Sequence, residues 1–347
     1  VMEDIWIERV KEQAASPSQM MLAIRGLAAI DSKGANEALQ SLVLNASALR
    51  KLRIAAASTL GTVAPEEQLA LSSNLQKGAS KQIMDALLGL ALINGSDSAE
   101  AVEVLEKYVG NQNSVVQSLA LGHLYRIDYK LVVPHVSEFL DSRDVNVRRW
   151  CAKALVDGRK ADDVAAVAKL LNDINPGLRT YAANSLVDFA EVKELKPLVV
   201  TEVEKVIAGD NWRGCEQACV VFGKIDHEAS AERKVELLGH PRGDVKVAAA
   251  WGLTQLRVAE MLPDMLDHAD SVYEGLRSGE LNARMPGVTF HLAHLCLAFG
   301  DQGYLAAEPL LRKLVPKSYD YGQYPRPAAV WSLGVFHKDD PEPKLVS

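Results

Sequence analysis

Residues 144–155 decide the fold of this chain and read Asp144-Val145-Asn146-Val147-Arg148-Arg149-Trp150-Cys151-Ala152-Lys153-Ala154-Leu155. Counted from Arg148, apolar or small residues stand at offsets −1, +3, +4 and +7. These offsets fall on one face of a helix with 3.6 residues per turn. Because the middle of that face is small, a neighbouring helix can approach it closely. The stretch therefore predicts an α-helix that is buried along one side.

The same pattern recurs along the chain. Copies begin at Leu52, Val116, Val147, Leu178, Val245 and Pro325, and a copy without the basic residue begins at Ile83. One more copy lies near Trp212-Arg213, in a register that ends at either Val220 or Phe222. A second apolar-periodic stretch separates successive copies, so the repeating unit is a helix, a turn and a helix. Such a unit cannot bury its face alone, and we expect the units to stack.

A short polar residue precedes several of these second helices, where its oxygen can accept hydrogen bonds from free backbone N–H groups. The candidate capping residues are Asp144, Asn175 or Asp173, Asp210 and Asp244.

Residues 144–155 resemble the second helix of a HEAT repeat of the short bacterial kind. They follow the pattern Asp–x–x–Val–Arg–x–x–Ala–x–x–Ala–Leu, with Cys151 at the first Ala position. The resemblance covers most of residues 18–260. It implies an all-α fold, a right-handed α-α superhelix of about nine helical hairpin repeats. It also implies a structural role for the acidic and basic residues of the motif, namely Asp144, Arg148, Arg179 and Lys246.

The regularity of the repeat changes along the chain. We expect regular HEAT-like repeats in residues 1–260 and modified C-terminal repeats of the same solenoid in residues 261–347. The second region carries a Tyr-rich insertion with Tyr319, Tyr321 and Tyr324. An insertion of this kind is expected either to bind a partner or to cap the stack.

The composition narrows the classes of function. The formal net charge is −7 without a long basic block, which counts against nucleic acid as the main partner. Four cysteines do not make a disulfide scaffold, and no apolar run approaches the ~20 residues that span a bilayer. The chain begins at Val1 instead of Met. We expect a soluble piece of a longer bacterial protein, from the cytoplasm or the periplasm, and leave its oligomeric state open.

One compact cluster could carry chemistry. His291 and His294 share a helix face and, with Cys296, could reach one metal ion. The surrounding apolar residues, Phe290 among them, favour a helix-packing surface instead. No catalytic residue, metal ligand or cofactor is therefore predicted, and a metal-dependent, enzyme-like site at these three residues stays as an alternative.

The outward positions of the second helices carry large side chains. At offsets +1, +2 and +5 they form a predicted partner-binding row of Arg149, Trp150, Lys153, Tyr181, Asn184 and Trp251. Trp, Tyr and Arg are enriched at binding hot spots, and exposed aromatic side chains are unusual. The competing interpretation is that these rings cover the neighbouring repeat.

The leading prediction is a non-catalytic scaffold that binds a protein or peptide on the concave face. In it, Trp150 and Tyr181 are anchors, whereas Arg149 and Lys153 contact acidic groups. A second alternative is nucleic-acid binding through a basic stripe of Arg148, Arg149, Lys153, Arg159 and Lys160.

Overall fold

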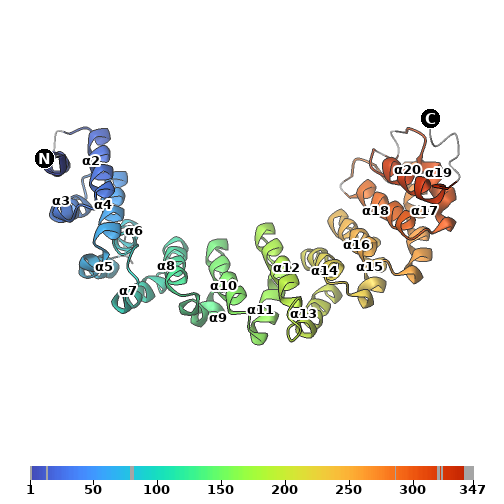
Figure 1. Ribbon diagram of the computed structural model, residues 1–347, viewed down its shortest axis with the longest axis horizontal. Coiled ribbons are helices and arrows are strands. Elements are labelled where there is room, and N and C mark those ends of the chain that lie inside the picture. The colour runs from blue at the N-terminus through green and yellow to red at the C-terminus, as the bar shows by residue number, and fades with distance from the viewer. Residues whose placement is uncertain are drawn as a thin grey trace. The chain divides into compact units, whose positions relative to one another are not determined.

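The computed structural model describes residues 2–12, 15–78, 82–285, 287–318, 321 and 323–339. Within these ranges the chain forms twenty α-helices, several short 3-10 helices and no β-strand (Figure 1). The fold is therefore all-α, as the repeat pattern predicts. No helix in these ranges is both long and apolar enough to cross a bilayer. Tyr319 lies outside the described residues.

The chain divides into two compact units, residues 1–158 (unit 1) and residues 159–347 (unit 2). The α-helices of unit 1 are α1 (Met2–Lys11), α2 (Pro17–Ala29), α3 (Asn36–Leu44), α4 (Arg50–Val63), α5 (Leu69–Gly78), α6 (Ile83–Leu92), α7 (Ala99–Val109), α8 (Ser114–Ile127), α9 (Val136–Phe139) and α10 (Val145–Gly158). Those of unit 2 are α11 (Val164–Lys169), α12 (Pro176–Ala190), α13 (Lys196–Ala208), α14 (Trp212–Lys224), α15 (Ala231–Leu238), α16 (Gly243–Leu256), α17 (Leu262–Ser278), α18 (Val288–Asp301), α19 (Glu308–Leu314) and α20 (Pro325–Phe336).

The helices pair in chain order into hairpins. In unit 1 the pairs run from α1 with α2 to α9 with α10, and in unit 2 from α11 with α12 to α19 with α20. The described residues thus hold ten hairpins, close to the nine expected. Helix α16 packs directly on α18, so the repeats continue across residue 260. The division into residues 1–260 and 261–347, which rests on regularity, stays a prediction.

Each unit has two layers of helices. In unit 1 the second helices α2, α4, α6, α8 and α10 contact one another in order, and in unit 2 the second helices run from α12 to α20 in the same way. The small residues of the motif lie between these helices: Ala56, Ala57, Cys151 and Ala152 are each 0% exposed. Burying them lets the second helices of neighbouring hairpins approach closely.

The basic residue of the motif is a helix cap. Arg53 Nε donates to the carbonyl oxygen of Val43 at 2.8 Å, and Arg179 Nη1 donates to that of Asp173 at 2.9 Å. The last carbonyls of a helix have no partner within it, so each buried guanidinium satisfies the end of the first helix of its own hairpin.

The uncertain copy ends at Phe222. Cys215 occupies the position of the basic residue, and its thiol lies 3.2 Å from the carbonyl oxygen of Gly209. Arg233 Nε reaches the same turn and donates to the carbonyl oxygen of Ile207 at 3.1 Å. The register that would place Arg213 in this position and end at Val220 is therefore wrong.

Two of the predicted caps are right. Asp144 Oδ1 accepts from the backbone N of Asn146 at 2.7 Å, and Asn175 Oδ1 accepts from Leu178 N at 3.0 Å. For the other two helices the prediction is one or two residues out: α14 is capped by Asn211 instead of Asp210, and Asp244 lies inside the first turn of α16. Acidic residues are favourable in a first turn because of the helix dipole.

Candidate functional site

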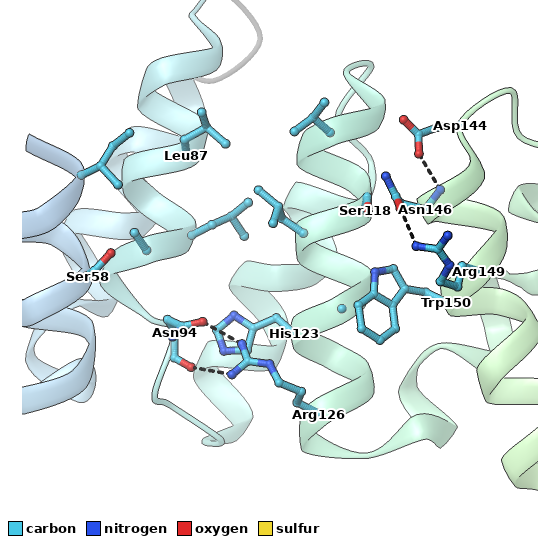
Figure 2. Close-up of a pocket in the computed structure, with 16 residues that line it drawn as sticks. Ser58, Leu87, Asn94, Ser118, His123, Arg126, Asp144, Asn146, Arg149 and Trp150 are labelled. Carbon is cyan, nitrogen blue, oxygen red and sulfur yellow. Dashed lines mark hydrogen bonds between the residues drawn. The ribbon is translucent and has the colours of Figure 1, made fainter. Parts of the chain in front are cut away.

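A groove crosses the second helices of unit 1. It has a volume of about 720 Å³ and is lined by residues of α4, α6, α8 and α10, together with the adjoining turn residues Asn94 and Asp144 (Figure 2). We call it the unit-1 groove. Its open apolar side chains are Ile54 (37% exposed), Val115 (52%) and Leu119 (48%). Exposed aliphatic side chains that line one cavity are typical of a binding surface.

Two arginines stand at the groove. Arg126 Nη2 donates to the side-chain oxygen of Asn94 at 2.7 Å, and Arg149 Nη1 donates to that of Asn146 at 2.9 Å. Both guanidiniums thus bind neutral amides, and neither forms an ion pair within the part of the chain that the structure describes. The lining carboxylate, Asp144, is already used as a cap. Its second oxygen accepts from Ser114 Oγ at 3.1 Å.

His123 lies at the floor of the groove and is only 4% exposed. Burial, together with the nearby charge of Arg126, lowers its pKa to about 4. The imidazole is therefore neutral near pH 7. The positive charge of the groove comes from its arginines and not from this residue.

Trp150 stands at one end of the groove, half-buried. A Cβ atom built on Gly122 would lie 2.8 Å from its ring, so the indole covers the preceding second helix. Tyr125 lies against it with ring centroids 5.2 Å apart, and Lys153 Nζ lies 4.8 Å from the indole centroid. The ring is therefore held by packing and also faces the groove (Figure 2).

The predicted row is shared between the two units. Arg149, Trp150 and Lys153 come together on α10 of unit 1, although Lys153 contacts the rings and does not line the groove. In unit 2, Tyr181 is half-buried on α12. Asn184, one turn further on, is exposed and its side-chain oxygen accepts from Lys224 Nζ at 3.0 Å.

Trp251 lines a separate cavity in unit 2. This cavity has a volume of about 540 Å³ and includes Val220 and Phe290. Phe290 stacks on Tyr324 with centroids 4.0 Å apart. Like Trp150, the indole of Trp251 covers a glycine of the preceding second helix, since a Cβ on Gly223 would lie 2.8 Å from it.

Sequence reasoning missed the apolar half of the unit-1 groove, although a signal was present. Ile54 stands at offset +1 from Arg53, and Leu119 stands at offset +2 from Gln117. These are the outward offsets that carry Arg149 and Trp150 in a later repeat. Applied to every copy, the same rule predicts both residues. Arg126 lies outside the repeated pattern and has no such signal.

The residues of the metal alternative do not converge. No group of three or more His, Cys, Asp or Glu side chains placed to hold a metal occurs in the described ranges. His291 pairs instead with His268, with 3.3 Å between their Nε2 atoms. Cys296 is 0% exposed, and burial raises the pKa of its thiol to about 12.

The basic stripe loses one predicted member. Arg148 is 5% exposed, and its guanidinium donates to the carbonyl oxygen of Ser142. It is therefore a buried cap and offers no positive surface to a phosphate backbone.

The comparisons with known proteins concern the fold. No protein-family model and no curated protein matches this chain. Among solved structures, importin-β matches with a TM-score of 0.59 at 12% identity, over 99% of this chain and 54% of that one. Kap95p in a structure with RanGDP matches with a TM-score of 0.58 at 14% identity, over 98% and 57%. Yeast importin-β (Kap95p) matches with a TM-score of 0.55 at 17% identity, over 98% and 51%. This chain therefore spans little more than half the length of these proteins.

Proposed function

We propose, from the premise that this chain has the HEAT-like α-solenoid fold, that it is a non-catalytic scaffold for protein interactions. A protein or peptide binds to the face of the second helices, which is the concave face in stacked helical repeats. The partner-binding residues are Arg149, Trp150 and Lys153 in unit 1 and Tyr181, Asn184 and Trp251 in unit 2. The single observation that carries the proposal is the unit-1 groove, where exposed aliphatic side chains lie beside Trp150 and two arginines.

The groove has the physical features of a binding site. Its walls are helices, so binding orders little backbone and the associated entropy cost stays small. Covering Ile54, Val115 and Leu119 removes apolar surface from water, worth roughly 25 cal/mol per Å². Trp150 is already fixed by its contacts with Gly122 and Tyr125, and a rigid aromatic ring is an effective anchor.

The structural neighbours favour a protein as the partner. Kap95p is seen with RanGDP in one of these structures and with Nup1 in another, so proteins of this fold bind other proteins. At 12–17% identity the likeness concerns the fold, and the proposal for this chain rests on its own groove.

The proposal includes no catalytic step and no cofactor. All four cysteines are buried, and burial raises the pKa of Cys151, Cys219 and Cys296 to about 12. These thiols are therefore protonated near pH 7 and are poor nucleophiles.

Site-specific photo-crosslinking tests the proposal. p-Benzoylphenylalanine replaces Leu119 in the groove or, as a control, exposed Lys107 on α7, and the protein is irradiated in a lysate of the organism that makes it. We expect protein adducts at position 119 that the Trp150→Ala/Tyr181→Ala double variant loses at unchanged helicity. Equal adduct patterns at both positions would overturn the assignment of this face.

A further inference from the structure

If the proposed function is right and a protein or peptide binds the unit-1 groove, the charges and apolar side chains of the groove indicate which kind of peptide it is. The chain as a whole carries a formal net charge of −7, yet the groove presents two guanidiniums that pair with no carboxylate among the described residues. Arg126 binds Asn94, and Arg149 binds Asn146. An amide oxygen leaves most of the charge on a guanidinium uncompensated, so a carboxylate can still approach it with a charge-assisted hydrogen bond.

Asp144, the carboxylate that lines the groove, forms no ion pair with either arginine in the described ranges. One oxygen of Asp144 accepts from the backbone N of Asn146 and the other from Ser114 Oγ. Both oxygens of this carboxylate therefore take part in hydrogen bonds at the N-terminus of α10. Lys153, with Nζ 4.8 Å from the Trp150 centroid and 5.5 Å from that of Tyr125, adds a third positive charge beside the groove.

The other half of the groove is apolar. Ile54 on α4 and Val115 and Leu119 on α8 are each more than a third exposed, and half-buried Leu87 on α6 lies between these helices. Figure 2 shows Leu87 on one side of the groove and Arg149 with Trp150 on the other. A partner that satisfies both halves must carry aliphatic or aromatic side chains together with carboxylates.

The geometry points to an acidic peptide segment with apolar anchors, provided by a protein partner, as the occupant of the unit-1 groove. The carboxylates of that segment bind Arg126 and Arg149, and its apolar side chains pack on Ile54, Val115 and Leu119. Four successive second helices line the groove, and neighbouring axes are about 8–10 Å apart, so the lined length is about 24–30 Å. An extended segment of about seven to nine residues covers that length.

A nucleic acid satisfies only one half of this surface. Phosphates would pair with the arginines, but bases gain by stacking on open aromatic faces. Trp150 has Lys153 over its ring and Tyr125 against it, and the remaining surface is aliphatic. Nucleic acid is therefore the competing outcome of the test.

The test is a selection with the full chain. An mRNA-displayed library of random 12-residue peptides is enriched on the intact protein, and selected peptides are measured by fluorescence anisotropy. We expect net-negative peptides with apolar residues. The affinity of these peptides for the Arg126→Gln/Arg149→Gln variant should be at least tenfold lower than for the parent, and the difference should be larger at low salt than at high salt. The matched control Lys107→Gln/Lys130→Gln removes the same charge from exposed residues outside the groove and should leave the affinity within about twofold.

A second variant separates the two levels of the proposal. Leu119→Ser removes an apolar contact without changing charge, and circular dichroism verifies that each variant keeps its helicity. One outcome would overturn the acidic occupant and leave the scaffold function standing. In it, Leu119→Ser lowers the affinity of the selected peptides, but these peptides are neutral or basic, or bind the arginine variant as tightly as the parent. If Leu119→Ser also leaves the peptide affinity unchanged, the unit-1 groove is not the binding site. A 12-nucleotide oligouridylate that displaces them and shows the same arginine dependence at higher affinity would assign the groove to nucleic acid.

Discussion

The guanidinium Nη1 of Arg148 lies 2.7 Å from the carbonyl oxygen of Ser142, which precedes the start of α10 at Val145. The same nitrogen lies 3.2 Å from the carbonyl oxygen of Arg143. Both carbonyls belong to the turn between α9, which ends at Phe139, and α10, which begins at Val145. The next residue, Arg149, is exposed and lines the unit-1 groove. Of these two adjacent arginines, one is therefore a buried cap, and the other is open in the groove where we propose that a partner binds.

Substitution of these neighbours is expected to separate the two roles. Arg148→Ala leaves buried carbonyl oxygens without donors, and we expect the free energy of unfolding to fall by about 2–3 kcal/mol. Arg149→Ala should change it by no more than about 0.5 kcal/mol, because its side chain is exposed. Urea denaturation followed by circular dichroism measures both. Equal losses from the two variants would show that the cap at Ser142 contributes no more than a surface contact.

The buried stripe of each second helix could be predicted from sequence because it depends on spacing alone. Val147, Cys151 and Leu155 are between 0% and 3% exposed, as their offsets require. The copy near Trp212 could not be placed, because Cys215 replaces the basic residue and Arg233, from the following hairpin, reaches the same turn.

The candidate site was only partly predictable. The offset rule finds Arg149 and Trp150, which depend on one helix. The exposure of Val115 depends on how the adjacent hairpin covers α8, and the hydrogen bond from Arg126 to Asn94 joins residues of different hairpins. Contacts of this kind depend on how hairpins stack, which the periodicity of a single helix does not encode.

The match between Gly122 and Trp150 gives a second prediction. A Cβ on Gly122 would meet the indole at 2.8 Å, so Gly122→Ala must move the ring. Overpacking of this kind costs about 1–3 kcal/mol, and alanine returns up to about 1 kcal/mol of helix propensity. We expect a net loss of about 1 kcal/mol in thermal or urea unfolding, together with weaker peptide binding in the groove.

Gly110→Ala is the matched control for this change. The nearest atom to a Cβ at Gly110 is the carbonyl oxygen of Lys107 at 3.7 Å, an ordinary contact. We expect it to be neutral or slightly stabilising. A Gly122→Ala protein as stable as Gly110→Ala, with unchanged groove affinity, would mean that the position of Trp150 is not fixed by this contact.

The pair of His268 and His291 predicts sensitivity to acid. The carbonyl oxygen of Gly287 lies 2.7 Å from His291 Nδ1, and because a carbonyl only accepts, that nitrogen carries the proton. His291 Nε2 therefore accepts from His268 Nε2, 3.3 Å away. Burial lowers the pKa of both imidazoles to about 4.

The sign of the effect follows from these pKa values. Unfolded histidine titrates near pH 6.5, so between pH 6.5 and 4 the unfolded state binds more protons and the free energy of unfolding falls as the pH falls. From pH 6.5 to 5 we expect a loss of about 2 kcal/mol for one such imidazole. Urea unfolding of the His268→Gln/His291→Gln variant should show a weaker pH dependence, whereas the control His240→Gln, at a half-buried position outside this pair, should follow the parent. A double variant with the parent's acid profile would refute the prediction.

Buried Lys234 predicts that the stability of the fold also changes at alkaline pH. It is 0% exposed, its Nζ hydrogen-bonds to Ser230 Oγ, and it lies 5.5 Å from the centroid of Phe222. Burial lowers its pKa to about 8, so near pH 7 the folded protein holds a buried positive charge. A charge of this kind is destabilising, because an ammonium loses its hydration when it is removed from water.

Lys234→Met keeps the aliphatic stem and removes the charge, and we expect the free energy of unfolding at pH 7 to rise by about 1–3 kcal/mol. Unfolded lysine titrates near pH 10.4, so between pH 8 and about 10 the unfolded parent binds more protons and its stability rises with pH. The methionine variant lacks this rise, and its advantage should shrink as the pH increases. Exposed Lys205→Met is the control and should track the parent at every pH. The opposite result would be a Lys234→Met protein that is less stable than the parent by the same amount at pH 7 and pH 10. In that case the lysine stabilises the fold through its packing and its hydrogen bond to Ser230, and its buried charge does not destabilise it.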